Sequence, residues 1–157
     1  MKKFLWVLII SFLFLLTGCE DGEPMPYREV PNQLSARRML ILTRKTEYVS
    51  QFLPYLENRA RQTYSLTIDD TSNILEYNFA YYNCVLVIET LDPDGSAPVM
   101  DNYMQIYSGS NNIVLHGLDY SYAAAYPLSV VTANAQNLDK GTLQNTAEKV
   151  FSLLRTK

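Results

Sequence analysis

The stretch Cys84-Val85-Leu86-Val87-Ile88 is apolar without a gap and contains several β-branched residues. A short, continuous apolar run of this kind predicts a strand that is buried on both faces of a sheet. The residues that follow, Asp92-Pro93-Asp94-Gly95, form a strong turn signal, because aspartate, proline and glycine each favour turn geometry. The centre of the chain therefore contains one strand that other elements must cover on both sides.

Strand-like sequence surrounds this run. From Ile74 to about Val131, tyrosine, valine, isoleucine and threonine are frequent and helix formers are few. Apolar residues alternate at Leu75, Tyr77, Phe79 and Tyr81, which predicts an upstream strand. Further strands are predicted at 100–107, 113–116, 119–124 and 128–132, with a turn over 108–112 between the first two.

Helical periodicity precedes the strand-like segment. Between Leu34 and Tyr64, the apolar residues recur at steps of three and four, at Val49, Phe52, Leu53, Leu56 and Ala60. Pro54 interrupts this stripe, and because proline removes a backbone hydrogen bond we expect a kink or two helices meeting there. The gapless run 39–42 leaves open a strand over 39–43 as the alternative.

A second helix is predicted at the C-terminus, with Asp139 or Thr142 as its cap. Its apolar stripe consists of Leu143, Ala147, Val150, Phe151 and Leu154. The order of helix, strands and helix predicts an α+β fold, a two-layer sandwich with an antiparallel sheet of four to five strands. A chain of 157 residues has room for one such domain.

The N-terminus has the pattern of a targeting segment. Lys2 and Lys3 precede an apolar run, 4–16, that is broken only by Ser11. This run is too short to cross the roughly 30 Å hydrocarbon core of a bilayer, but it has the length of a signal-peptide core. Leu16-Thr17-Gly18-Cys19 follows directly.

These residues resemble the leader and lipobox of bacterial lipoprotein precursors. The resemblance implies cleavage before Cys19 and acylation of that cysteine, and it covers the leader alone. We therefore expect a signal peptide over 1–18, the lipidated Cys19 with a proline-containing flexible tether over 19–33, and one domain over 34–157. Glu20 is a poor match to the aspartate of an inner-membrane retention signal, so we expect anchoring at the outer membrane, facing the periplasm or the surface.

Charge is sorted along the chain. No lysine or arginine lies between Arg61 and Lys140, a segment that carries nine acidic residues, whereas the preceding segment is basic. The two regions are expected either to attract each other within the fold or to meet partners, and a basic protein would suit the acidic region. With a formal net charge of −3 there is no general electrostatic reason to expect nucleic-acid binding.

The sequence offers little for catalysis. The lone His116 could act as a base with Asp119 or Asp101, or pair with Cys84, but a structural role is the simpler interpretation. One histidine excludes a multi-histidine metal site, and Asp92, Asp94 and Ser96 indicate a turn more than a calcium loop. We therefore expect no enzymatic activity, no cofactor and no metal.

Tyrosine provides the candidate binding residues, because its ring is apolar and its tip is polar. The residues selected for a binding surface are Tyr103, Tyr107, Tyr120, Tyr122 and Tyr126. The favoured hypothesis is a lipid-anchored interaction protein of the cell envelope, accessory to a secretion, conjugation or pilus assembly, or an immunity lipoprotein. The alternative is a lipoprotein that binds a small ligand or a glycan through these tyrosines.

Overall fold

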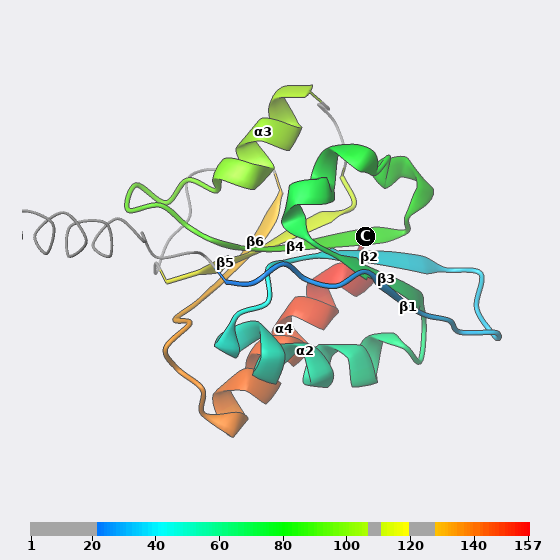
Figure 1. Ribbon diagram of the computed structural model, residues 1–157. Helices are drawn as coiled ribbons and strands as arrows, with labels where there is room; N and C mark the ends of the chain where they lie inside the picture. Colours follow the sequence, from blue (N-terminus) through cyan, green and yellow to red (C-terminus); the bar gives the residue numbers. More distant parts are fainter. Residues whose placement is uncertain (1–21, 107–110, 120–127) are drawn as a thin grey trace, which may run out of the picture.

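The computed structural model of the chain describes residues 22–106, 111–119 and 128–157 (Figure 1). They form one six-stranded sheet in the order β1-β3-β2-β4-β5-β6. The strands are β1 (Arg28–Val30), β2 (Arg38–Leu42), β3 (Ser65–Asp69), β4 (Cys84–Thr90), β5 (Ile113–Leu118) and β6 (Ser129–Ala133). Neighbouring strands from β3 to β6 are parallel, and only the short edge strand β1 runs antiparallel to its neighbour β3.

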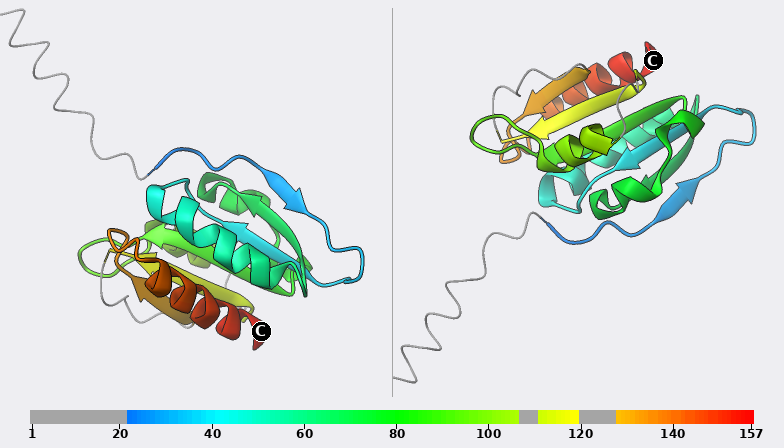
Figure 2. Two further views of the ribbon diagram at one scale, coloured as in Figure 1. Left: turned by 90° about the horizontal axis from the view of Figure 1, so that it is seen from below. Right: turned by 90° about the horizontal axis from the view of Figure 1, so that it is seen from above.

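Helices cover both faces of the sheet. They are α2 (Glu47–Ala60), α3 (Pro98–Ile106) and α4 (Lys140–Arg155), with two short 3-10 helices, η1 (Thr71–Glu76) and η2 (Phe79–Tyr81). The helices α2 and α4 lie side by side on one face, while η1, η2 and α3 cover the other (Figures 1 and 2). The molecule is therefore a three-layer α/β protein.

The predicted α+β sandwich with an antiparallel sheet is wrong. All residues of β2, β4 and β5 are buried except Arg38, the first residue of β2, and Thr90, the last residue of β4. These three strands are therefore covered on both faces. Parallel sheets have this property, and their strands appear in the sequence as continuous apolar runs without alternation. The same property that correctly predicted a doubly covered strand at 84–88 therefore also indicated a parallel sheet.

Two predicted strands are helical instead. The alternating residues at 75–81 belong to η1, the loop after it and η2, and each of these 3-10 helices is capped by a side chain, Asp70 or Asn78. The predicted strand at 100–107 is the helix α3 over its described part. The strands predicted at 84–88, 113–116 and 128–132 are confirmed as β4, β5 and β6. Residues 120–124 of the remaining predicted strand lie outside the described residues.

The region 34–64 divides into a strand and a helix, so the strand left open at 39–43 is correct. The helix α2 begins only at Glu47, with Thr46 as its cap, and buries the predicted stripe from Val49 to Ala60. It runs through Pro54 as one helix, so two separate helices do not form. Pro54 and Ser50 are both exposed, and the Ser50 carbonyl that loses its usual donor can bind water there.

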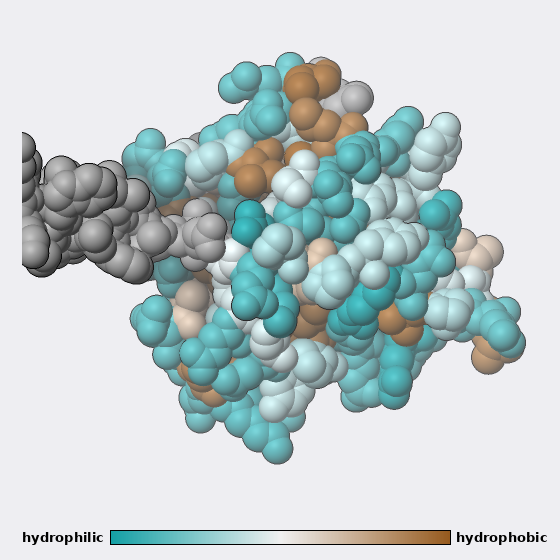
Figure 3. All heavy atoms as spheres, viewed as in Figure 1, coloured by the Kyte–Doolittle hydropathy of each residue, from teal (hydrophilic) through white to brown (hydrophobic). Residues whose placement is uncertain are grey.

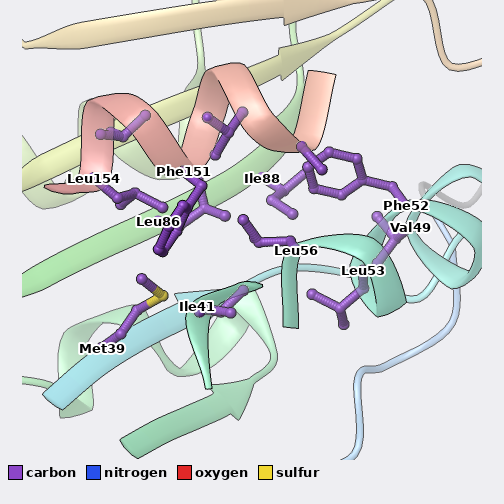
Figure 4. Close-up of a cluster of buried hydrophobic side chains, with 14 of the residues drawn as sticks. Met39, Ile41, Val49, Phe52, Leu53, Leu56, Leu86, Ile88, Phe151 and Leu154 are labelled. Atoms are coloured by element: carbon purple, nitrogen blue, oxygen red, sulfur yellow. The ribbon is translucent and has the colours of Figure 1, made fainter. Parts of the chain in front are cut away.

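The larger hydrophobic core lies between the sheet and the pair α2–α4 (Figure 4). Every residue of the stripe predicted for the C-terminal helix is buried, and Asp139 is the cap, so the predictions for α4 are confirmed. A second core under α3 contains Phe79 and Tyr103, whose rings stack with centroids 3.9 Å apart. Within the described ranges no helix is long and apolar enough to cross a bilayer.

The segment assigned to a flexible tether packs on the domain over its described part. Besides contributing β1, it contains Met25, which is buried. Residues 22–25, named the strap below, lie across the ends of β2 and β3: Glu23 and Lys45 exchange two backbone hydrogen bonds of 2.9 and 2.8 Å, and the Met25 N–H donates to Asp70 at 2.7 Å. The folded unit therefore includes residues from Gly22 onward.

Candidate functional site

The strand order reverses at one point in the sheet. Numbered from β2, the five parallel strands follow the order 2-1-3-4-5, so the chain leaves β2 toward β3 on one side and later returns to β4 on the other. In open α/β sheets, ligands bind in the crevice outside the carboxyl ends of the strands where the order reverses. In this chain that position lies between the ends of β2 and β4.

A cavity of about 200 Å³ lies at this position. Its polar walls come from the ends of three strands: Thr43 and Arg44 follow β2, Thr71 follows β3, and Glu89 and Thr90 end β4. The remaining wall includes the cap of α2 and the first turn of α3. Ligand pockets usually measure about 300–1,000 Å³, so this cavity suits a small group or one end of a larger ligand.

Glu89 is the buried acid of the cavity wall, with only 8 % of the residue exposed. Its carboxylate accepts the backbone N–H groups of Val99 at 2.5 Å and Met100 at 3.1 Å, so it caps α3 from ten residues upstream. Burial raises the pKa of Glu89 to about 7, although these two hydrogen bonds act in the opposite direction. The group therefore changes charge near neutral pH.

Arg44 provides the positive charge of the cavity wall. One of its terminal nitrogens donates to the carbonyl of Gly22 at 2.7 Å, and its Nε lies 3.7 Å from Asp70 Oδ2 without a hydrogen bond among the described residues. Burial alone would raise the pKa of Asp70, but backbone hydrogen bonds from Ser72 and Met25 outweigh it and lower that pKa. Arg44 and the ionised Asp70 thus join the cavity wall to the strap.

A wider hollow adjoins the cavity along the same edge of the sheet. Gly22 and Lys45 line it on one side, Asp119 and Gln136 line it on the other, and Thr90 borders both spaces. Its volume is about 740 Å³, and it is open to solvent. The strap, the cavity and this hollow therefore share the edge formed by the carboxyl ends of the parallel strands, called the carboxyl edge below.

The predicted binding tyrosines do not form this site. Tyr103 is 2 % exposed and belongs to the core under α3, so it is unavailable as a surface residue. The other four candidates, Tyr107, Tyr120, Tyr122 and Tyr126, lie outside the described residues, as does Cys19. The described tyrosines with the most exposed rings are Tyr27 and Tyr81.

His116 lies in the core rather than in a cleft. It is fully buried, with Nδ1 2.9 Å from the carbonyl of Val131 and Nε2 2.9 Å from the hydroxyl of Tyr48. Because a carbonyl can only accept, Nδ1 carries the proton and Nε2 accepts from the tyrosine. Burial lowers the pKa of His116 to about 4, so the ring is neutral and structural, and neither Asp119 nor Asp101 orients it.

The remaining candidates for chemistry have structural roles. Cys84 is buried, and burial raises its pKa to about 12, which makes it a poor nucleophile. The residues 92–96 form the predicted turn, in which Asp94 accepts two hydrogen bonds from Ser96 and Gly95 has a positive φ of 82°. Among the described residues, no group of three or more histidine, cysteine or acidic side chains could hold a metal ion.

The charge sorting is partly resolved within the fold. Arg44, whose Nε lies 3.7 Å from Asp70, joins the basic segment to the acidic one. The ion pairs of Arg28 and Arg59 instead use Glu57 and Glu148, which lie outside the acidic segment. The face seen in Figure 3 is mostly hydrophilic, with hydrophobic atoms gathered over α3 near the top. The basic and acidic regions therefore contact each other only in part.

Four residues of the cavity wall were not predicted from the sequence: Thr43, Arg44, Glu89 and Thr90. They are the two residues after each of the apolar runs 39–42 and 84–88, which is a usable signal only when the strands are known to be parallel. In an antiparallel sheet the carboxyl ends of the strands do not share one edge. The wrong prediction of the fold therefore hid the fact that these residues lie together.

No family model matches the sequence, and no curated protein matches it either. Among solved structures, the chain is similar to Smu.1420 from Streptococcus mutans UA159, with a TM-score of 0.45 and 7 % identity over 77 % of this chain and 100 % of that one. It is also similar to oxidised flavodoxin 2 from Bacillus cereus, with a TM-score of 0.46 and 6 % identity over 78 % and 100 %. The strand order itself is of the flavodoxin-like type, and these similarities say nothing about ligand or activity.

Proposed function

We propose that this chain is a lipid-anchored protein of the bacterial cell envelope that binds a small polar ligand at the carboxyl edge of its sheet. The observation that carries the proposal is the cavity between β2 and β4, where polar side chains from three strand ends meet. The protein acts by binding, and Cys19 is its acylated residue.

The proposed anchor rests on the leader. Lys2 and Lys3, the apolar run 4–16 and Leu16-Thr17-Gly18-Cys19 together resemble a lipoprotein signal peptide with its lipobox. Several acyl chains on one cysteine hold a protein firmly, because each buried CH₂ contributes about 0.8 kcal/mol. The outer membrane is the proposed location.

The proposed ligand is small and carries an anionic group together with a cationic or hydrogen-bond-donating group. The guanidinium of Arg44 suits an anionic group, whereas Asp92 and the partly ionised Glu89 suit a cationic or hydrogen-bond-donating one. Hydroxyl groups of Thr43, Thr71 and Thr90 complete the polar lining. Probes of matching chemistry are phosphoethanolamine, glycerol phosphate and zwitterionic amino acids.

The anchor is tested with Cys19→Ser. The wild-type protein should fractionate with membranes, and the variant should be released into the soluble fraction. Ala36→Ser, which adds a hydroxyl at an exposed position of the domain, serves as the control and should stay with the membranes. Membrane association of the Cys19→Ser protein would contradict the proposal.

Ligand binding is tested by thermal denaturation with each probe. A ligand at 100 times its Kd stabilises the fold by about 2.7 kcal/mol, which gives a clear rise in Tm. Thr90→Val removes a hydroxyl from the cavity wall and should weaken the rise, whereas Thr63→Val, at the opposite edge of the sheet, should leave it unchanged. The proposal fails for these probes if none raises Tm, or if the wild-type and Thr90→Val proteins respond alike.

The second candidate function is that of an interaction protein for an envelope assembly, or of an immunity lipoprotein. It is favoured by exposed acidic residues along the carboxyl edge, Glu47, Asp92, Asp94, Asp119 and Asp139, which would suit a basic partner. Purification in mild detergent should then recover a stoichiometric partner at low salt that dissociates at high salt. Recovery of the chain alone at both salt concentrations would contradict this candidate.

A further inference from the structure

We propose that the strap fixes how the anchored domain faces the membrane, so that the carboxyl edge and its cavity lie next to the lipid headgroups. This inference rests on the proposed acylation of Cys19. It makes the bilayer surface the partner of the carboxyl edge, and it identifies the ligand of the cavity as a polar group displayed at that surface.

The strap is held at its first residues by several independent contacts. The Gly22 carbonyl accepts from Arg44, the backbone of Glu23 pairs with that of Lys45, and the side chains of Glu23 and Lys45 form an ion pair of 2.9 Å. The buried Met25 then follows, with its N–H on Asp70. The strap is therefore held on the domain from its first residue, Gly22.

The backbone at Gly22 is specific to this arrangement. Its φ is +90°, a conformation that residues with a side chain rarely adopt. A Cβ at this position would lie 2.7 Å from the Lys45 carbonyl oxygen and 2.7 Å from Thr46 Cγ2. Only glycine lets the chain approach the loop after β2 so closely, so Gly22→Val should detach the start of the strap.

The remaining tether is very short. Three residue steps separate Cys19 from Gly22, and an extended chain covers at most about 3.6 Å per residue, so Gly22 lies within roughly 11 Å of the acylated residue. The prediction of a tether over 19–33 allowed a distance of about 40 Å at roughly 3 Å per residue. The strap therefore brings the domain much closer to the bilayer than a free tether would.

The two edges of the sheet differ in distance from the anchor. Gly22 and Gln136 both line the open hollow at the carboxyl edge. Gln62 follows the C-terminal end of α2, and this helix of 14 residues spans about 20 Å. Rotation about the short tether keeps the carboxyl edge near the headgroups, whereas the edge with Gln62 is held farther away.

Tryptophan fluorescence tests this orientation. The only tryptophan of the chain is Trp6 in the leader, so the protein cleaved before Cys19 has none. Gln136→Trp and Gln62→Trp place matched probes at exposed positions on the two edges. Each acylated protein is reconstituted in phosphatidylcholine vesicles, with and without a spin label on the lipid headgroups. Phosphatidylcholine has no net charge, so its surface does not repel the acidic residues of the carboxyl edge. Quenching at position 136 should exceed that at position 62 at least twofold.

A longer tether provides the control. Insertion of twelve glycine and serine residues between Asp21 and Gly22 leaves the strap intact and should abolish the difference between the probes. Gly22→Val should reduce the difference by releasing the chain as far as β1. Equal quenching at both positions without the insertion, or stronger quenching at position 62, would overturn the inference.

The mass of each purified protein separates the two proposals. A protein without acyl groups on Cys19 would overturn the proposed anchor and the inference that rests on it. An acylated protein with equal quenching at Gln136→Trp and Gln62→Trp would overturn the orientation alone.

Discussion

Replacing His116 by glutamine removes the only histidine of the chain from the centre of its core. The imidazole bridges two elements, because it donates to the backbone of β6 and accepts from Tyr48 on α2. The ring of Phe52 lies 4.9 Å from it, centroid to centroid. Protonation would add a charge to this apolar site and remove the acceptor for the tyrosine hydroxyl.

The size of the effect follows from the shift in pKa. Burial lowers the pKa of His116 from 6.5 to about 4, so the folded state resists protonation in a range where the unfolded chain accepts it. The stabilisation is complete above pH 6.5 and is lost as the pH falls toward 4. Between pH 7 and pH 5 the loss amounts to about 2 kcal/mol by proton linkage.

Urea denaturation followed by circular dichroism at pH 7 and pH 5 measures this loss. The wild-type free energy of unfolding, relative to that of His116→Gln, should fall by about 2 kcal/mol between the two pH values. Taking the difference is necessary because Glu89 titrates in the same range with the opposite sign. Parallel pH dependence of the two proteins would refute the reasoning, as would an NMR titration of His116 with a pKa near 6.5.

Three further predictions concern other buried groups. Burial raises the pKa of Glu89 from 4.5 to about 7, so the contribution of Glu89 to stability falls as the pH rises between those values. In the same assay, the free energy of unfolding of Glu89→Gln, relative to that of the wild type, should rise by about 2 kcal/mol from pH 5 to pH 7. An unchanged difference between the two proteins would contradict this prediction. Val150→Asp should unfold the domain because it buries an unpaired carboxylate. The control Ser152→Asp, on the exposed side of α4, should keep a cooperative melting transition. Similar melting curves for the two variants would contradict the packing of α4 on the sheet. In a Cys19→Ser background, the thiol of Cys84 should react with Ellman's reagent only after unfolding, and rapid reaction of the native protein would disprove its burial.

Local sequence patterns predicted the elements that are stabilised by their own side chains. The stripe from Leu143 to Leu154 and the cap at Asp139 define α4 without reference to the rest of the fold. The apolar run at 84–88 predicted β4 for the same reason. The helix α2 was predicted at its core, although its start was displaced because the strand β2 directly precedes it.

Elements that depend on distant groups were not predicted. The first turn of α3 is held by Glu89, ten residues upstream, and no pattern within 98–106 reveals that contact. Pro98 at the first helical position was a local signal, since proline is favoured there, but the aromatic and β-branched residues nearby favoured a strand. The strap was predicted to be free chain because its contacts are with distant residues; the N–H of Met25, for example, donates to Asp70, 45 residues away.

The site could not be predicted without the strand order. Arg44 and Glu89 are far apart in the sequence and meet because β2 and β4 are parallel neighbours. The absence of alternation in 39–42, 84–88 and 113–115 was the available evidence for parallel pairing. Once the sheet is known to be parallel, the polar residues that follow the runs 39–42 and 84–88 share one edge.

The most direct test of the proposed function and of the proposed orientation is the intact mass of the protein purified from membranes. We predict a chain that begins at Cys19 and carries acyl groups on that residue, with no intact leader. A mature chain that begins elsewhere, or that begins at Cys19 without acyl groups, would contradict the lipid anchor and the orientation that depends on it.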